Sequence, residues 1–238
     1  MKKIKDNSLC LVITEEYGKG RNAMEIAESA IRGGVDIIQM REKNRSKDWL
    51  IGMGKDLARI CKANNVIFIV NDDPFLAAEV DADGVHLGQE DALKYPIDKA
   101  RKVLGEDKII GISTHSITQF TAANDGGFDP SARPGPVESL AQGQSRACRG
   151  ADYITFGPIF ETKTKGYFLG AENVGEVVRI AKRPAFFIGG INLANIGDIL
   201  KRGAKNIALI RGITEAEDMT ARTREFKRLL GPPLVKSK

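Results

Sequence analysis

The chain has 238 residues, of which 42% are hydrophobic and 28% are charged, and its formal net charge is +5. This composition is typical of a folded globular protein and argues against a disordered chain. No apolar run approaches the ~20 residues that a membrane-spanning helix needs, and the N-terminus lacks a signal-peptide pattern, so we expect a cytoplasmic protein that does not bind membranes.

The cysteines and the basic residues narrow the class further. Cys10, Cys61 and Cys148 are widely spaced and form no Cys-x-x-Cys motif, which disfavours both a disulfide framework and a zinc cluster. A basic chain can bind nucleic acid, an anionic membrane surface or a phosphorylated small molecule. Because acids are interspersed with the basic residues and aromatics make up only 6%, we favour a phosphorylated small molecule and expect no nucleic acid.

Short apolar runs alternate along the chain with amphipathic stretches of helical length. We expect strands at residues 9–13, 36–40, 66–70, 84–87, 109–113, 153–156, 185–188 and 206–210. We expect helices at residues 22–32, 47–63, 74–79, 97–104, 174–181, 193–201 and 216–230. Strands that alternate with helices predict βαβ units and a parallel sheet. Eight such units predict a single (β/α)8 TIM barrel over residues 1–238, with a doubly wound open sheet as the alternative.

The stretch at about 124–149 interrupts this pattern. A helix is expected between the fifth and sixth strands, and residues 118–123 could begin one, but the prolines and glycines that follow are poor material for continuing it. We expect an inserted surface loop here, with a folded lid as the alternative. Residues 231–238 are expected to form a basic, solvated tail.

Polar side chains follow several of the predicted strands, and the active site of such a barrel lies at the C-terminal ends of its strands. Strand alternation places Gln39, Arg41 and Lys43 on one face, where two cations and an amide suit a diphosphate. Residues 41–43 could also be a solvated charge run.

Two carboxylates, Asp72 and Asp91, follow the third and fourth strands and could hold one Mg²⁺. Asn71 and Asp72 could instead cap the helix that begins near residue 74, and Asp91 could be a turn residue. We interpret His86 as a packed, hydrogen-bonded side chain rather than as a ligand or base.

Glycines after the seventh strand, together with the backbone after the eighth, form the phosphate site common in such barrels. Gly189 and Gly190 are these glycines, although they could serve only the turn, and Thr162 and Thr164 could be loop surface. The sequence therefore implies two anion sites, one for a diphosphate with a metal ion and one for a monophosphate opposite to it.

Seven strings in this order resemble the thiamine-phosphate synthase (thiamine-phosphate pyrophosphorylase) family. They are QMREK at 39–43, VND at 70–72, ADGVHLGQED at 82–91, IGIS at 110–113, GPIF at 157–160 with residues 162–165, GGIN at 189–192, and IR at 210–211. The resemblance covers nearly the whole chain apart from residues 124–149. The region between Ser113 and Gly150 is longer than the family's usual helix, and the segment after Lys165 departs from the family pattern.

The resemblance implies an enzyme that joins 4-amino-2-methyl-5-hydroxymethylpyrimidine diphosphate to 4-methyl-5-(2-phosphoethyl)thiazole, giving thiamine phosphate and diphosphate. It implies a dissociative reaction in which Arg41, Lys43, Lys165 and Ser113 are catalytic, and a Mg²⁺ cofactor bound by Asp72 and Asp91. The residues that it implies for the pyrimidine diphosphate are Gln39, Arg41, Lys43, Asn71, Ser113 and Lys165. Those that it implies for the thiazole phosphate are Thr162, Thr164, Gly190, Ile210 and Arg211, the last two through backbone groups.

Two other functions stay open at this point. A thiazole tautomerase would handle the thiazole phosphate without needing Arg41, Lys43, Asp72, Asp91 and Lys165 together. A non-catalytic phosphate-binding barrel would bind these ligands without forming a product. The two small molecules are the expected partners, and whether the chain forms a homo-oligomer is left open.

Overall fold

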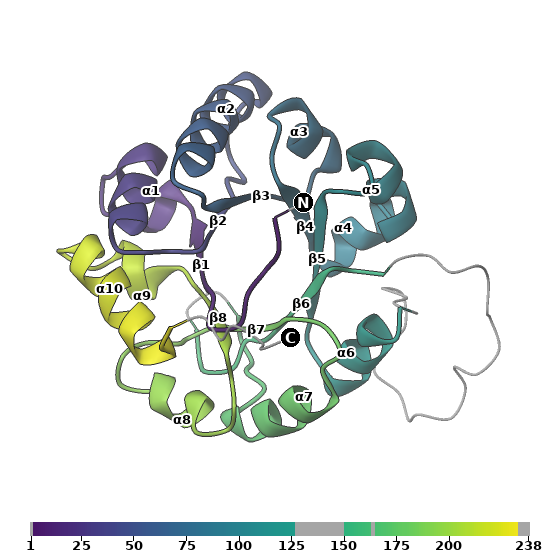
Figure 1. Cartoon of the computed structure of the whole chain (residues 1–238), viewed down its shortest axis with the longest axis vertical. Helices are drawn as coiled ribbons and strands as arrows, with labels where there is room; N and C mark the ends of the chain where they lie inside the picture. The colour runs from purple at the N-terminus through teal and green to yellow at the C-terminus, as the bar shows by residue number, and fades with distance from the viewer. Residues whose placement is uncertain (1, 127–149, 163–164, 233–238) are drawn as a thin grey trace.

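Eight parallel strands close into a barrel in the computed structural model, which describes residues 2–126, 150–162 and 165–232 (Figure 1). Each strand pairs with the next in the chain, and β8 pairs with β1, so the ring has no free sheet edge. The strands are β1 Leu9–Ile13, β2 Ile37–Met40, β3 Ile67–Asn71, β4 Gly84–Leu87, β5 Ile109–Thr114, β6 Tyr153–Phe156, β7 Ala185–Ile188 and β8 Asn206–Leu209. The predicted (β/α)8 barrel is confirmed, and the open-sheet alternative is wrong.

Helices surround the barrel, as Figure 1 shows, and most begin close to where the sequence places them. The described α-helices are α1 Ala23–Arg32, α2 Lys47–Ala63, α3 Pro74–Glu79, α4 Gln89–Lys94, α5 Ile97–Leu104, α6 Ile117–Asn124, α7 Val174–Ile180, α8 Ile196–Leu200, α9 Arg211–Thr214 and α10 Met219–Leu230. Short 3-10 helices lie at Glu15–Tyr17 and Ala171–Asn173.

The helix predictions fail where a helix is short or has a polar cap. The sequence did not predict α4 and α9, which are six and four residues long and show little hydrophobic periodicity, whereas the similarly short α3 is marked by Pro74 at its first turn. The predicted helix at 216–230 begins only at Met219, where the Asp218 side chain accepts the Ala221 N–H at 2.8 Å and caps the first turn. The predicted helix at 193–201 is reduced to Ile196–Leu200.

Two apolar layers hold the barrel together. A smaller inner cluster fills the ring and includes Cys10, Ile69, Tyr153 and Phe186, while the larger cluster packs between the strands and the surrounding helices. Strands buried on both faces explain the continuous apolar runs in the sequence.

Three aspartates, Asp36, Asp83 and Asp152, stand directly before β2, β4 and β6 at the N-terminal end of the barrel. Each accepts a backbone N–H from the neighbouring odd-numbered strand at 2.7–2.9 Å. Each is also paired with a cation at 2.6–2.9 Å, and the three cations are Lys227, Lys2 and Arg101 in the same order. These hydrogen bonds and ion pairs therefore stabilise the N-terminal end of the barrel.

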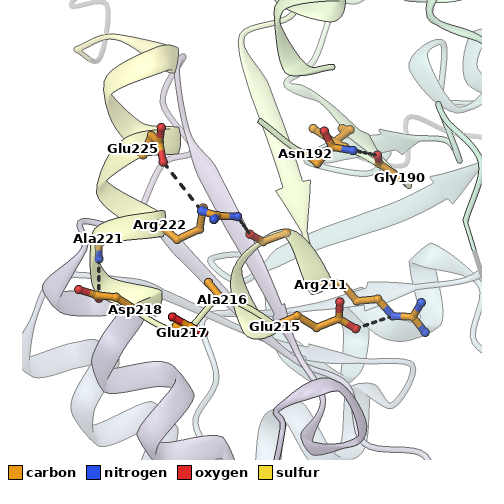
Figure 2. A pocket seen from close by; sticks show the side chains of 12 residues that line it. Gly190, Asn192, Arg211, Glu215, Ala216, Glu217, Asp218, Ala221, Arg222 and Glu225 are labelled. Carbon is orange, nitrogen blue, oxygen red and sulfur yellow. Dashed lines mark hydrogen bonds and ion pairs between the residues drawn. The ribbon is translucent and has the colours of Figure 1, made fainter. Parts of the chain in front are cut away.

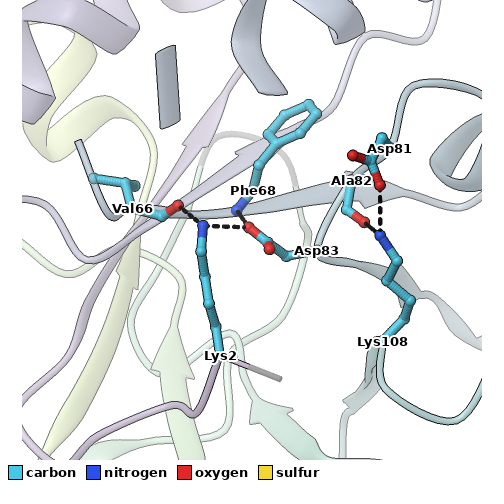
Figure 3. Close-up of polar contacts among 7 residues, drawn as sticks. All are labelled: Lys2, Val66, Phe68, Asp81, Ala82, Asp83 and Lys108. Atoms are coloured by element: carbon cyan, nitrogen blue, oxygen red, sulfur yellow. Dashed lines mark hydrogen bonds and ion pairs between the residues drawn. The ribbon is translucent and has the colours of Figure 1, made fainter. Parts of the chain in front are cut away.

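Lys2 shows how the N-terminal segment crosses this pole (Figure 3). Its ammonium group donates to the Val66 carbonyl at 2.7 Å and to the Asp83 carboxylate at 2.9 Å. Ile4 packs against the inner cluster, so the segment covers the end of the barrel opposite to the predicted active site.

The predicted insertion begins within the described part of the chain and continues outside it. Helix α6 occupies the place of the expected fifth helix, and the side chain of its last residue, Asn124, accepts the Lys182 N–H at 2.7 Å. Residues 127–149 and most of the predicted tail, residues 233–238, lie outside the described residues. Within the described residues, no helix is long and apolar enough to cross a membrane.

Candidate active site

The C-terminal ends of neighbouring strands bring together side chains that lie far apart in the sequence. Gln39, near the end of β2, donates from Nε2 to Oδ1 of Asn71 at 2.6 Å. Asn71 is the last residue of β3 and pairs in register with His86 of β4. Gln39 and Asn71, which were both predicted to contact the pyrimidine diphosphate, therefore lie side by side.

Asp72 and Asp91 form an acidic pair next to these amides. Asp72 follows β3 in the left-handed conformation, with φ at 71°, and its N–H donates to the His86 carbonyl at 2.8 Å. Burial, and to a smaller extent the nearby Asp91 carboxylate, raises the pKa of Asp72 to about 6. The Lys43 ammonium group acts in the opposite direction and lowers the same pKa, which places Lys43 in the electrostatic surroundings of the pair.

The alternative prediction that Asn71 or Asp72 caps α3 is wrong. Asp73, not Asn71 or Asp72, caps α3 by accepting the N–H groups of Phe75 and Leu76. Asp91 lies in the first turn of α4, where its Oδ2 accepts the Gly88 N–H at 3.3 Å. Asp72 is thus left with a carboxylate that caps no helix.

The acidic pair fits a magnesium ion by the chemistry of its donors. The described residues contain no group of three or more histidine, cysteine or acidic side chains arranged to hold a metal. Mg²⁺ commonly takes one or two carboxylates and completes its shell with water and substrate phosphate, so two are sufficient. Two carboxylates held close enough to raise a pKa are also stabilised by a shared cation.

His86 forms a buried hydrogen-bonded chain with Ser113. Its Nε2 lies 2.9 Å from Ser113 Oγ, and its Nδ1 lies 3.0 Å from the Tyr153 hydroxyl. Burial lowers the pKa of His86 to about 3, so the ring is neutral at physiological pH. As predicted, His86 is a packed, hydrogen-bonded side chain, and its position orients the Ser113 hydroxyl.

The segment with Arg41 and Lys43 differs from the strand geometry that the sequence predicted. β2 ends at Met40, so strand alternation does not extend to Lys43, which lies exposed in the following loop. Glu42 fixes this loop, because its Oε1 accepts the Glu15 N–H at 2.6 Å. Arg41 stays half-buried at the strand end, where its N–H donates to the Ile13 carbonyl at 2.9 Å.

A separate cavity of about 210 Å³ lies across the same end of the barrel, where β6, β7 and β8 end. It is lined by Tyr17, Glu161, Thr162, Ile188, Gly189, Gly190, Ile191, Ala208, Leu209, Ile210, Arg211 and Gly212. Four of the predicted thiazole-phosphate residues, Thr162, Gly190, Ile210 and Arg211, thus share one cavity. The fifth, Thr164, lies outside the described residues.

The double glycine is required by the backbone of this cavity. Gly189 and Gly190 have φ values of 99° and 67°, a region that side chains disfavour. A Cβ at Gly189 would lie 2.4 Å from Pro158 Cβ, and one at Gly190 would lie 2.5 Å from the Glu161 carbonyl oxygen. The close approach brings the backbone to the cavity wall, where its amides can face an anion.

Lys165 lies next to the thiazole-phosphate cavity and near β5. Its N–H donates to Thr162 Oγ1 at 3.1 Å, and its ammonium group lies 5.7 Å from the centroid of the Tyr167 ring. His115, two residues after Ser113, donates from Nδ1–H to the Gly157 carbonyl at 2.6 Å, and burial and the Lys165 charge lower the pKa of His115. Lys165 therefore lies beside Thr162, which lines the cavity, and in the electrostatic surroundings of His115, which follows β5.

Sequence reasoning missed two aromatic groups at this site. The His115 ring packs edge-on against Tyr167 with centroids 6.4 Å apart, and Tyr17 lines the cavity beside Arg211. Tyr17 follows the first strand, as the other predicted site residues follow theirs, and this position was a usable signal. Nothing in the sequence indicated that Tyr167 meets His115.

A wider groove of about 710 Å³ adjoins the cavity on its outer side (Figure 2). The two share Gly190, Ile191, Arg211 and Gly212. The remainder of the groove is lined largely by polar residues of the α9–α10 region, including Arg222 and Glu225, which are 3.8 Å apart. None of the predicted pyrimidine-diphosphate residues lines it.

Comparisons with known proteins agree over most of the chain. The family model for thiamine monophosphate synthase matches residues 9–132 and 135–213. A thiamine-phosphate synthase of Halalkalibacterium halodurans is 36% identical over 230 residues, covering 95% of this chain and 97% of the relative. One of Pelotomaculum thermopropionicum is 38% identical over 218 residues, covering 90% of this chain and 88% of the relative.

Solved structures extend the similarity to the fold. The thiamine phosphate pyrophosphorylase of Pyrococcus furiosus superposes with a TM-score of 0.77 at 29% identity, covering 94% of this chain and 95% of that one. A 3-hexulose-6-phosphate synthase, with a TM-score of 0.57 and 16% identity, shares the fold alone.

Proposed function

Because this chain belongs to the thiamine monophosphate synthase family, we propose that it joins the pyrimidine diphosphate and the thiazole phosphate to give thiamine phosphate and diphosphate. The observation that supports this proposal is that two separate regions, each lined by predicted substrate-binding residues, lie on one end of the barrel. Gln39, Asn71, Asp72 and Asp91 form the first, and the cavity with Gly190 forms the second. A single-substrate tautomerase would not need the first region.

The pyrimidine diphosphate is assigned to the region at β2 to β5. Gln39 and Asn71 are held to each other and Ser113 is held by His86, so these polar groups are oriented before substrate arrives. Arg41 and Lys43 supply positive charge next to them. Asp72 and Asp91 would hold Mg²⁺, which as a Lewis acid stabilises negative charge on a departing diphosphate when it is bound.

The reaction is proposed to be dissociative, so its main requirement is stabilisation of the leaving group. The carbon–oxygen bond to the diphosphate breaks with its electron pair leaving on the diphosphate, and the thiazole nitrogen then donates a pair to the pyrimidine methyl cation. Arg41, Lys43 and Lys165 are the donors that face the leaving charge, and each such donor is typically worth ~3 kcal/mol in a water-excluded site. No strong base is needed, which is consistent with a neutral, buried His86.

The thiazole phosphate is assigned to the cavity, where Thr162, Gly190 and the backbone at Ile210 and Arg211 would hold its phosphate. Anchoring the phosphate keeps the ring nitrogen close to the cation. Such positioning converts a bimolecular attack into an effectively unimolecular one, worth up to ~7–11 kcal/mol in ideal cases. The location in the cytoplasm and any homo-oligomer stay predictions.

The test is to mix both substrates with Mg²⁺ and to measure diphosphate and thiamine phosphate. We expect both products, whereas a non-catalytic barrel would bind the ligands without product and a tautomerase would release no diphosphate. Lys165→Ala should lower kcat by ~10²–10³ and leave thiazole-phosphate affinity nearly unchanged. The matched control is Lys201→Ala, at an exposed lysine just after α8. Equal losses in kcat and in thiazole affinity would refute the leaving-group role of Lys165.

A further inference from the structure

The side chain of Arg211 lies where the family resemblance assigns only a backbone role. It is the one cation among the described residues that line the 210 Å³ cavity. Its Nε lies 3.5 Å from Glu215 Oε1 in an i,i+4 ion pair, which Figure 2 shows, and the Arg211 side chain is 27% exposed. Its terminal nitrogens donate no hydrogen bond to any residue that the structure describes. The guanidinium group therefore keeps donors that protein groups do not use.

Tyr17 holds this guanidinium group in place. The Arg211 Cζ atom lies 4.0 Å from the centroid of the Tyr17 ring, and Tyr17 lines the same cavity. Stacking on an aromatic face leaves the edge of the planar guanidinium, with its hydrogen-bond donors, available to an anion. Tyr17 belongs to the 3-10 helix after β1 and Arg211 begins α9 after β8, so the contact exists because β1 and β8 are paired.

We propose that the Arg211 guanidinium, positioned on the Tyr17 ring, binds the phosphate of the thiazole substrate and makes this cavity selective for the phosphorylated form. The assignment rests on the proposed function, because it identifies the occupant of the cavity as the thiazole phosphate. Arg211 is a specificity residue that touches substrate, and Tyr17 is a positioning residue that acts through Arg211.

The composition of the cavity supports this assignment. Gly189, Gly190 and Gly212 contribute only backbone, and Ile188, Ala208 and Leu209 are apolar. These residues suit a heteroaromatic ring but cannot neutralise a phosphate dianion. Thr162 adds a hydroxyl and the exposed Glu161 a negative charge, so among the described lining residues the positive charge comes from Arg211. Arg211 lies at the end of the cavity that opens into the wider groove, since it lines both. A ring bound among the apolar residues would thus place its phosphate arm toward Arg211.

The experiment measures binding without turnover. Calorimetry would give the Kd of 4-methyl-5-(2-phosphoethyl)thiazole and of the corresponding alcohol, which lacks the phosphate, for the full-length protein and four variants. Arg211→Gln should weaken binding of the phosphate form about tenfold and leave the alcohol unchanged, since a charge-assisted contact to phosphate is lost. Tyr17→Leu should weaken the phosphate form about threefold to fivefold. Tyr17→Phe keeps the aromatic face and should bind like the wild type.

The matched control is Arg202→Gln, which removes the same charge at the opposite end of β8. Arg202 is exposed and its side chain has no hydrogen bond or ion pair with a residue that the structure describes. It should leave both Kd values within about 1.5-fold of wild type, because exposed charges beyond a Debye length of ~8 Å are largely screened. Steady-state kinetics should then show a raised KM for the thiazole phosphate alone in Arg211→Gln, with the KM of the pyrimidine diphosphate unchanged.

Three results would overturn the inference. They are equal losses for phosphate and alcohol in Arg211→Gln, no loss in that variant, and failure of Tyr17→Phe to restore binding that Tyr17→Leu loses. The Tyr17 variants decide the matter if Arg211→Gln does not fold. If the wild type binds the thiazole phosphate but forms no thiamine phosphate, the proposed function fails while the assignment of Arg211 is still decided by the Kd values.

Discussion

Asp72→Asn should stabilise the metal-free barrel and abolish its synthase activity. The side chain of Asp72 is largely enclosed beside a second carboxylate, and both burial and Asp91 disfavour its charge. Asparagine is nearly the same size and is among the residues that tolerate the left-handed backbone conformation found here, with φ at 71°. The substitution therefore removes a destabilising charge without introducing backbone strain.

The magnitude follows from the pKa of Asp72. Burial and Asp91 raise it from 3.8 to about 6. Each pKa unit corresponds to about 1.36 kcal/mol, and partial exposure to solvent screens part of this penalty, so we expect a gain in unfolding free energy of about 1–2 kcal/mol. Because the pKa of the folded state is the higher one, the penalty is fully present above pH 6 and vanishes below pH 4. The gain in unfolding free energy of Asp72→Asn should likewise be full above pH 6 and absent below pH 4.

Urea unfolding in EDTA, repeated at several pH values between 4 and 8, measures this difference. Mg²⁺ should stabilise the wild type by mass action and leave Asp72→Asn unchanged. The control is Asp73→Asn, the same change at the adjacent residue, where asparagine caps α3 as well as aspartate does and the effect should stay within about 0.5 kcal/mol. A metal-free Asp72→Asn protein that is less stable than wild type at pH 7 would refute the reasoning.

Two further predictions concern buried charge. Burial lowers the pKa of His86 to about 3, against an ordinary value of 6.5. Between these two pH values the unfolded chain binds a proton at His86 that the folded protein does not bind. The free energy of unfolding of the wild type should therefore fall by up to about 1.4 kcal/mol per pH unit as the pH drops below 6.5. His86→Gln should flatten this slope in urea unfolding at pH 4–7, and an unchanged slope would contradict it. Arg101→Ala should cost about 3–5 kcal/mol, since the Arg101 and Asp152 side chains are only 6% and 15% exposed and the substitution removes the cation that lies 2.7 Å from this largely buried carboxylate. Arg59→Ala, which breaks the exposed pair with Asp56, should lower the free energy of unfolding by less than about 1 kcal/mol. Similar losses in the two variants would contradict the larger contribution of the buried pair.

The barrel and the positions of its strands were predictable because their signals are local. Four of the eight strands have the predicted bounds, three differ by one residue at one end, and β3 is shifted by one residue at both ends. A parallel strand covered on both faces must be a short apolar run, and such a run is visible without knowing what covers it. The same argument selected Gln39, Asn71, Asp72 and Gly190, since polar residues and glycines at or just after the end of a strand are recognisable in the sequence and all parallel strands end on one rim.

The tertiary structure decided which of these residues contact one another. The sequence placed Arg211 after the eighth strand, but its stacking on Tyr17 depends on the closure that pairs β8 with β1. The partners of Arg101 and His86 likewise come from parts of the chain that are distant in sequence. Hydrophobic periodicity reports the face that a segment buries. It carries no information on which distant side chain reaches the same point, because that depends on the ring diameter, the strand stagger and the loop paths, which the whole chain sets together.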